Sequence, residues 1–193
     1  MAVTQQPLVV VGSVNADLAV QLDRLPSPGE TLSASTLEFF PGGKGANQAA
    51  AAARAGCHTY FVGQVGKDAN APVLREALAG AGVDLTHMRE VEGPTGTALI
   101  LLQPGGENSI IIVGGANQSG WEVSEPAKQL LATAGAGDCF TATYAVAVLE
   151  GKSPAAALQF ASAAAALCVQ CKGAMPSLPS RAEVDSFLAT QTL

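Results

Sequence analysis

The sequence is poor in charged and aromatic residues. Charged residues make up 13% of the 193 residues and aromatic residues 5%. Lysine and arginine total 10 against 16 acidic residues, and no basic run occurs, which argues against nucleic acid as a partner. No apolar run approaches the roughly 18 residues that a membrane-spanning helix needs, so a membrane is not an expected partner either.

The sequence also shows no targeting segment. The opening residues, MAVTQQPLVVVGS, reach an apolar run almost at once and contain no basic stretch. A signal peptide needs such a stretch, then an apolar core and a cleavage site. We therefore expect a cytoplasmic protein, and a plastid location stays open.

Histidine is scarce, and the four cysteines form no clear metal site. Cys168 and Cys171 have C-x-x-C spacing, which can hold a metal or form a redox pair. They lie in the alanine-rich run SAAAALCVQCKG, with no second pair and no histidine nearby. The favoured interpretation is two small apolar residues on a buried helix. His58 and His87 lack partners at ligand or catalytic spacing, so we expect them to be structural or exposed.

Apolar residues, many of them alanine, make up 48% of the chain, which suits one globular domain, residues 1–193. The continuous apolar runs at 7–14 and 58–66 are typical of strands buried on both faces. Helical patterns at 45–56 and 68–82 follow them. Such alternation predicts an α/β core with a mostly parallel sheet.

A second, smaller sheet is also expected. Residues of about 16–40 and 95–113 alternate between apolar and polar, which predicts half-exposed strands that could form a lid. The second of these ranges contains a hairpin turn at Pro104, Gly105 and Gly106.

Three helices are predicted in the C-terminal part. The first runs from Gly137 to about Glu150. The second starts with Ser153 as N-cap and Pro154 as its first residue, and ends at Gly173. The third starts at a capping box formed by Ser180 and Glu183.

The stretch AGAGDCF places Asp138 at the start of a helix. Gly135 and Gly137 free the backbone at the turn, and unpaired N–H groups at a helix N-terminus can bind an anion. Asp138 could simply stabilise the helix dipole. It could instead be a general base beside the anion, taking the proton from a hydroxyl that attacks a phosphoryl group.

Two further polar clusters precede or open predicted elements. In FFPGGKGANQA the backbone of Gly42, Gly43 and Gly45 can approach a ligand closely, while Lys44 and Asn47 can bind hydroxyls. The spacing fits neither a Walker A loop nor a dinucleotide fingerprint, and a plain turn is the alternative.

Asn15 and Asp17 follow the first strand at its carboxyl end, where ligands bind on open α/β sheets. Two residues apart in an extended segment, they point to the same side. They could form hydrogen bonds with adjacent hydroxyls of a sugar, or they could stabilise a turn.

The motifs GSVNAD, PGGKGANQA, TGTALI, GGAN and AGAGD occur in an order that resembles the ribokinase-like, phosphofructokinase-B family of carbohydrate kinases, and plant ribokinases in particular. The resemblance covers about residues 8–117 and 133–188. It implies a three-layer α/β/α core with a small β-sheet lid. It also implies phosphorylation of D-ribose to D-ribose 5-phosphate with ATP, Mg²⁺ and a monovalent cation, K⁺, and a homodimer formed through the lid.

The resemblance also implies roles for residues. Asp138 would be the catalytic base, and the backbone of Gly135, Ala136 and Gly137 would form the anion hole. The sugar would be held by a set of polar groups: Asn15, Asp17, Gly43, Lys44 and Asn47. Ser177 would contribute to the monovalent-cation site, together with carbonyls near Cys171 and Gly173.

The chain departs from the family pattern at a seam of about residues 117–133. Members of the family have several strands and helices there, which supply an Asn-x-x-Glu motif and a nucleotide loop. No asparagine of this chain has glutamate three residues on, and Ala132 replaces an aspartate of the cation site. We therefore expect a shortened core with a weakened nucleotide half, a low unfolding midpoint or self-association.

Two other functions stay open from the sequence. The chain could be a catalytically impaired sugar-binding or dimerising fragment, because the nucleotide half is reduced. It could also be a kinase for another sugar or nucleoside.

Overall fold

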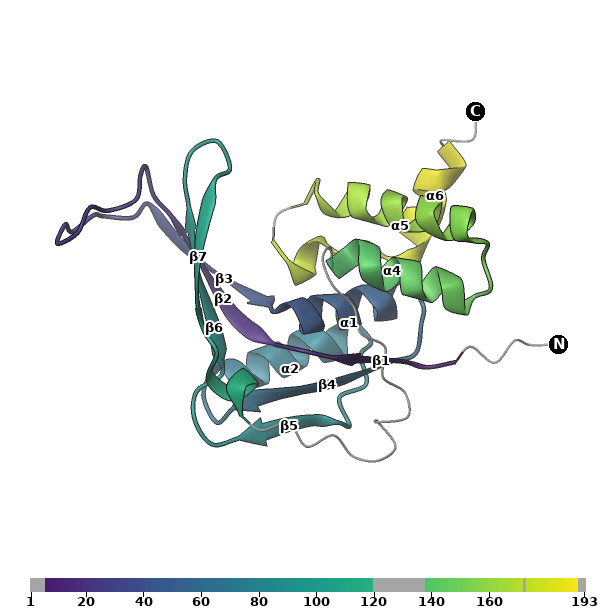
Figure 1. Cartoon of the computed structure of the whole chain (residues 1–193), viewed down its shortest axis with the longest axis horizontal. Coiled ribbons are helices and arrows are strands. Elements are labelled where there is room, and N and C mark those ends of the chain that lie inside the picture. The colour runs from purple at the N-terminus through teal and green to yellow at the C-terminus, as the bar shows by residue number, and fades with distance from the viewer. Residues whose placement is uncertain (1–5, 120–137, 172, 191–193) are drawn as a thin grey trace.

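The computed structural model describes residues 6–119, 138–171 and 173–190, which form two sheets and the helices around them (Figure 1). The first sheet is parallel, in the order β1-β4-β5. Its strands are β1 (Leu8–Val11), β4 (Thr59–Gly66) and β5 (Met88–Val91). The central strand β4 is almost wholly buried, as its continuous apolar run predicts.

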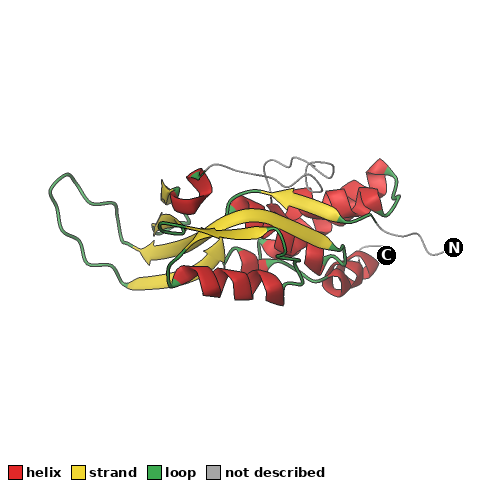
Figure 2. Ribbon diagram, turned by 90° about the horizontal axis from the view of Figure 1, so that it is seen from below, coloured by secondary structure: helices red, strands yellow, loops and turns green. Residues whose placement is uncertain are grey.

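The second sheet is mixed, in the order β3-β2-β6-β7. Its strands are β2 (Asn15–Gln21), β3 (Thr36–Gly42), β6 (Gly96–Leu102) and β7 (Asn108–Val113). β2 pairs antiparallel with β3 and parallel with β6, and β6 forms a hairpin with β7. Figure 2 shows the loop between β2 and β3 projecting at one end of the molecule.

Two helices lie against the parallel sheet. α1 (Lys44–Arg54) contacts β1 and β4, and α2 (Asn70–Gly80) contacts β4 and α1. The strand order advances in one direction, so right-handed crossovers place both helices on the same face. The other face of β1 and β4 carries Val9 and Val62, which form a small apolar cluster of their own.

The C-terminal helices pack on one another beside α1 (Figure 1). α4 (Asp138–Leu149) contacts α1, α5 (Pro154–Cys168) contacts α4, and α6 (Arg181–Thr190) contacts α5. Two short 3-10 helices complete the described structure, η1 (Gly115–Gln118) and η2 (Met175–Ser177). No helix in the described parts of the chain is long and apolar enough to cross a membrane.

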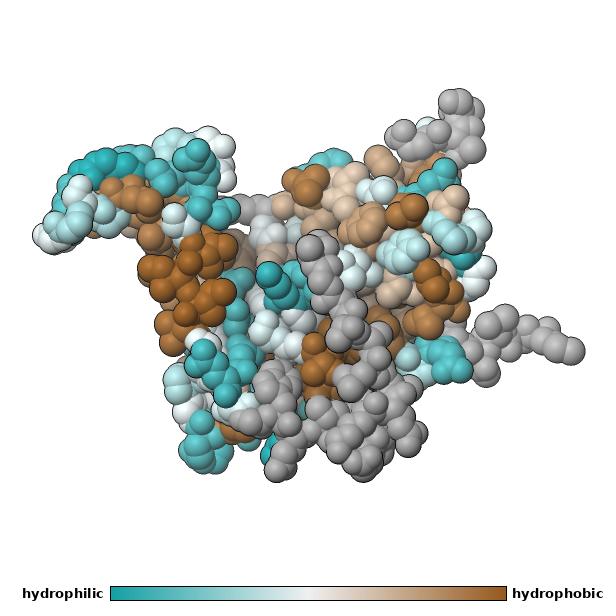
Figure 3. All heavy atoms as spheres, viewed as in Figure 1, coloured by the Kyte–Doolittle hydropathy of each residue, from teal (hydrophilic) through white to brown (hydrophobic). Residues whose placement is uncertain are grey.

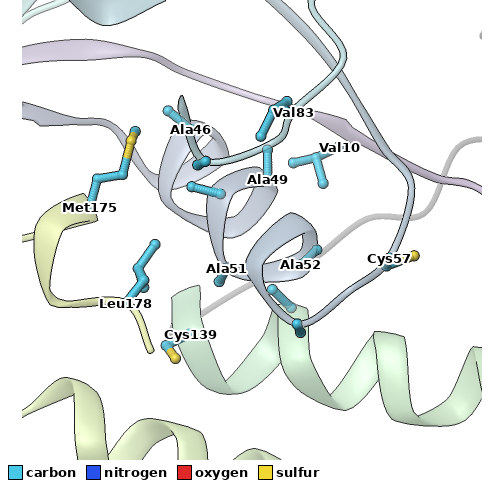
Figure 4. Close-up of a cluster of buried hydrophobic side chains, with 14 of the residues drawn as sticks. Val10, Ala46, Ala49, Ala51, Ala52, Cys57, Val83, Cys139, Met175 and Leu178 are labelled. Carbon is cyan, nitrogen blue, oxygen red and sulfur yellow. The ribbon is translucent and has the colours of Figure 1, made fainter. Parts of the chain in front are cut away.

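The core is centred on α1, whose buried residues are nearly all alanine. Figure 4 shows these alanines between Val10 and Val83 on one side and Met175 and Leu178 on the other. Because alanine side chains are short, the backbone of α1 can approach several elements at once. Phe61 and Leu74, both fully buried, supply bulk on the sheet side.

The α/β class, the parallel sheet and the second sheet agree with the sequence-based predictions. So do the helix starts: Ser153 Oγ accepts a hydrogen bond from the Ala156 N–H, and Ser180 and Glu183 form the predicted capping box. β5 was not predicted, because its sequence MREV is short and half polar.

The predicted end of the second C-terminal helix at Gly173 is wrong. α5 ends at Cys168, and Cys171 lies outside it and is exposed. The chain leaves the helix through a turn, and Gly173 stands later, with φ +100° and beside the ring of Phe40. The interpretation of Cys168 and Cys171 as two residues of one buried helix is therefore wrong for Cys171.

The fold depends on a close approach between Gly45 and Gly12. A Cβ on Gly45 would lie 2.6 Å from the Gly12 Cα, a backbone atom that cannot move aside cheaply. We predict that Gly45→Ala lowers the free energy of unfolding by about 1–3 kcal/mol, as overpacking does. Chemical denaturation measures it. Gly80→Ala is the matched control, because nothing lies within 4 Å of that position and alanine favours the helix. Equal stability of the two variants would contradict the close approach.

Candidate active site

A cavity of about 340 Å³ lies where β2, the start of α1 and the β6–β7 hairpin meet. It collects side chains from segments far apart in the sequence. Its polar lining residues are Ser13, Asn15, Asp17, Lys44, Asn47 and Asn117. The five residues predicted to hold a sugar, Gly43 included, all line this one cavity.

Asn15 and Asp17 reach the cavity because they are alternate residues of β2. The Asn15 carboxamide oxygen accepts a hydrogen bond of 2.8 Å from Asn117 Nδ2. Asn117 is itself fixed to the backbone of Val14, donating to its carbonyl and accepting from its N–H, both at 3.0 Å. The position of Asn15 is thus set by a residue about a hundred positions later.

Asp17 is a buried carboxyl group, 8% exposed. Burial raises its pKa from 3.8 to about 6. Removing the carboxylate from water disfavours its charged form, which is the cause of the shift. A ligand hydroxyl in the cavity that donates a hydrogen bond to the Asp17 carboxylate would stabilise the charged form.

Gly43 is required at the start of α1. Its φ of +94° lies in the left-handed region, and a Cβ there would come within 2.7 Å of the Ser13 carbonyl oxygen. The turn brings Lys44 and Asn47 to the cavity on the first turn of α1. Lys44 is exposed, and so its ammonium group is open to a ligand.

Asp138, the first residue of α4, is held by two amide groups of α1. Gln48 Nε2 donates to one carboxylate oxygen at 2.9 Å, and Asn47 Nδ2 donates to the other at 3.3 Å. These bonds join residues ninety positions apart. They fix the carboxylate beside the first cavity, because Asn47 also lines that cavity.

One polar atom of Asn47 is a hydrogen-bond acceptor that a ligand could use. Its Oδ1 is buried and finds no hydrogen-bond partner among the described residues. A buried acceptor left unpaired costs free energy, which a ligand hydroxyl could recover.

A second cavity, of about 410 Å³, has Asp138 in its wall. It is formed by the start of α4, the end of α5 and η2, and Asn47 lines it as well. Ser177 lies in its wall and is buried; its hydroxyl donates to the Ala174 carbonyl at 2.6 Å. The two cavities therefore meet at Asn47, next to Asp138.

The described walls of the second cavity offer a poor metal site. Asp138 is the one carboxylate among its described lining residues, and no group of three potential metal ligands occurs in the described ranges. Ser177 is in place for the predicted cation site, but hard cations are held by several oxygen ligands. The residues present therefore do not make a Mg²⁺ or K⁺ site by themselves.

The sequence predicted most of this site. It missed Gln48, because an amide side chain next to Asn47 on a helix has no distinguishing pattern. It also missed Asn117, because the GGAN motif by itself indicates no role for its asparagine. Gly135, Ala136 and Gly137, predicted as the anion hole, lie outside the described residues.

Comparison with known proteins identifies the family. The model of the pfkB family carbohydrate kinases matches residues 5–120 and 117–181, which is most of the chain. This chain belongs to that family. It is a carbohydrate kinase by descent, and the predicted resemblance is confirmed.

Several of the similar proteins are ribokinases. A ribokinase of Arabidopsis thaliana is 34% identical, over 94% of this chain and 81% of the relative. A ribokinase of Haemophilus influenzae is 40% identical, but the match covers 58% of this chain and 37% of that protein. The solved structure of the Arabidopsis thaliana ribokinase complexed with ribose and ATP gives a TM-score of 0.82 at 33% identity, covering 94% of this chain and 98% of that one. The ribokinase-like fold is thereby confirmed.

The raised pKa of Asp17 predicts a pH-dependent stability. Between pH 4 and 6 the folded protein keeps this proton while the unfolded chain loses it, so the free energy of unfolding falls as the pH rises. The fall is about 2–3 kcal/mol, and it is complete above pH 6. Urea titrations of the natural protein and of Asp17→Asn measure it. The natural protein should lose stability relative to the variant across this range; parallel curves would contradict the buried carboxyl.

Proposed function

We propose that this carbohydrate kinase transfers the γ-phosphoryl group of ATP to D-ribose, giving D-ribose 5-phosphate. The first cavity would hold the sugar, and the second would lie on the nucleotide side. Support for the substrates comes from the similar Arabidopsis ribokinase, whose structure contains ribose and ATP. Support from this chain comes from Asn47, which lines both cavities and donates a hydrogen bond to the Asp138 carboxylate in the wall of the second.

In the proposed step, Asp138 acts as the general base. Its carboxylate accepts the proton of the sugar's primary hydroxyl as that oxygen attacks the γ-phosphorus, and ADP leaves. The donors Gln48 and Asn47 orient the carboxylate for this role. The residues of the proposed anion hole, Gly135 to Gly137, precede α4, whose N-terminus favours negative charge.

The sugar contacts follow from the cavity lining. Asn15 and Asp17 would bind adjacent hydroxyls, the Asp17 carboxylate accepting from one of them. Asn47 Oδ1, buried and unpaired, would accept from another. Lys44 would donate to a sugar oxygen from the exposed edge of the cavity.

Mg²⁺ and K⁺ belong to this proposal only as groups bound with the nucleotide. Mg²⁺ would neutralise phosphate charge, and a monovalent cation would order the loop near Ser177. Nucleotide phosphates would supply oxygen ligands in addition to those of the protein.

We further propose that the chain is shortened internally at about residues 117–133. The alignment with the Arabidopsis ribokinase runs over 306 positions, although this chain has 193 residues, so more than a hundred positions lack a counterpart here. The family match is also split near residue 120. These observations favour the second candidate, a sugar-binding fragment with impaired nucleotide binding.

The exposed edge of the second sheet supports a homodimer through the proposed lid. β7 is an edge strand on which Ile110, Ile111, Ile112 and Val113 are all more than half exposed. Figure 3 shows hydrophobic surface gathered over this part of the molecule. Exposed apolar edge strands tend to pair with another chain.

Asp138→Asn tests the catalytic base. ADP release is measured with ribose, ATP, Mg²⁺ and K⁺, and we predict a loss of about 10²–10⁴-fold in kcat, the range for removal of a general base. Asp23→Asn is the matched control, because Asp23 is exposed and lines neither cavity. Equal turnover by Asp138→Asn and the natural chain would refute this role.

The same assay separates the two candidate functions. If the natural chain does not release ADP, but calorimetry shows that it binds ribose and that Asn15→Ala weakens this binding, the chain is a sugar-binding fragment. Ribose-dependent ADP release would exclude it.

Ile111→Lys tests the dimer. Ile111 is 54% exposed and does not line the sugar cavity, whereas its neighbours Ile110 and Ile112 do. A lysine at this place should shift a dimer to the monomer in sedimentation velocity, because a charge would be buried in the contact. Ser109→Lys, at the end of the same hairpin, should have the smaller effect. A natural chain that sediments as a monomer would refute the proposal.

A further inference from the structure

Three cysteines line the second cavity, Cys139, Cys168 and Cys171, and the proposed phosphoryl transfer uses none of their thiols. Cys168 is the last residue of α5 and is half-buried, and Cys171 follows on the exposed turn. Both line the cavity that also contains Asp138. Both are free thiols in the structure.

The turn holds these two cysteines at a distance that a disulfide can span. The Cys171 N–H donates to the Cys168 carbonyl at 3.2 Å, which closes a four-residue turn. The Cα atoms at the ends of such a turn lie within about 7 Å. A disulfide needs Cα atoms about 4.4–6.8 Å apart, so the pair could be joined with little backbone movement.

The other two cysteines are placed differently. Cys139 lines the same cavity and its thiol is hydrogen-bonded to Cys168, but it is buried, and its pKa is raised to about 12, first by burial and then by the neighbouring Cys168. A thiol with such a pKa hardly reacts at neutral pH, since the thiolate is the nucleophile. Cys57 is buried and does not line the cavity. Of the four cysteines, Cys171 alone is exposed, and a reagent in solution can therefore reach it.

We propose that Cys168 and Cys171 form a dithiol–disulfide site in the wall of the Asp138 cavity, with a small soluble disulfide such as oxidised glutathione as the oxidant. The inference goes beyond sugar phosphorylation and does not depend on it. It rests on the turn, on the exposure of Cys171 and on the shared cavity.

The exchange takes place in two steps. The Cys171 sulfur, after giving its proton to water, attacks one sulfur of oxidised glutathione and releases a first glutathione thiolate. The Cys168 sulfur, likewise deprotonated, then attacks Cys171 in the mixed disulfide and releases the second. The two protein thiols are oxidised to one disulfide, and oxidised glutathione is reduced to two thiols that take up the two protons.

Disulfide formation changes the wall of the cavity. In the reduced structure Cys168 Sγ lies 3.2 Å from Ser177 Oγ, and the Ser177 hydroxyl is bonded to the Ala174 carbonyl. A bond to Cys171 turns the Cys168 sulfur toward the exposed turn and away from Ser177. The end of α5 and η2 would thereby lose one of the contacts that join them.

The experiment uses the full chain and oxidised glutathione. Free thiols are counted with a chromogenic disulfide reagent after unfolding, and peptides are mapped by mass spectrometry. We expect the loss of two of the four thiols, a peptide linked between Cys168 and Cys171, and full recovery with a reductant. Cys171→Ser should form no internal disulfide, whereas Cys57→Ser should still lose two thiols.

Three results would overturn the proposal. They are no loss of thiols, a stable mixed disulfide with glutathione on Cys171, and a disulfide that includes Cys139. Because thiols and linked peptides are measured directly, none of these results depends on whether the chain phosphorylates a sugar. Cys171 is exposed, so its replacement by serine should leave the fold intact, which circular dichroism checks.

Discussion

The close packing of α1 is the constraint on which the rest of the structure depends. Its alanine side chains let the sheet, α4 and η2 all approach one helix. Gly45 allows the start of the helix to touch the backbone at Gly12. The same helix then places Asn47 and Gln48 against Asp138. A larger side chain on the buried face would therefore disturb both the core and the site.

Much of the architecture could be read from the sequence because local signals and burial agree. Continuous apolar runs mark β1 and β4, and cap residues mark the starts of α5 and α6. The end of α5 was misplaced because Val169, Gln170 and Cys171 continue the apolar and helix-forming pattern of the helix. Nothing in this local sequence shows that the chain turns there.

In the site, too, local features could be predicted from the sequence and tertiary contacts could not. The sequence could predict that Asn15 and Asp17 point to the same side, because the two-residue period of a strand is a local property. The bonds from Gln48 to Asp138 and from Asn117 to Asn15 join segments about ninety and a hundred residues apart. Such contacts depend on the tertiary fold, and a single sequence gives no measure of them. The proposed role of Asp138 as a base came from the resemblance to a family, because its place at a helix start left two roles open.

Asn47 belongs to the walls of both cavities, and this shared wall has a thermodynamic consequence. If both cavities bind ligands as proposed, a ligand on either side would orient this amide, and occupation of one cavity would change the free energy of binding in the other. Linkage requires the effect to be reciprocal: the factor by which a first ligand alters the affinity for a second equals the factor in the opposite direction. A single side chain would thus make the two proposed binding equilibria of this small domain interdependent.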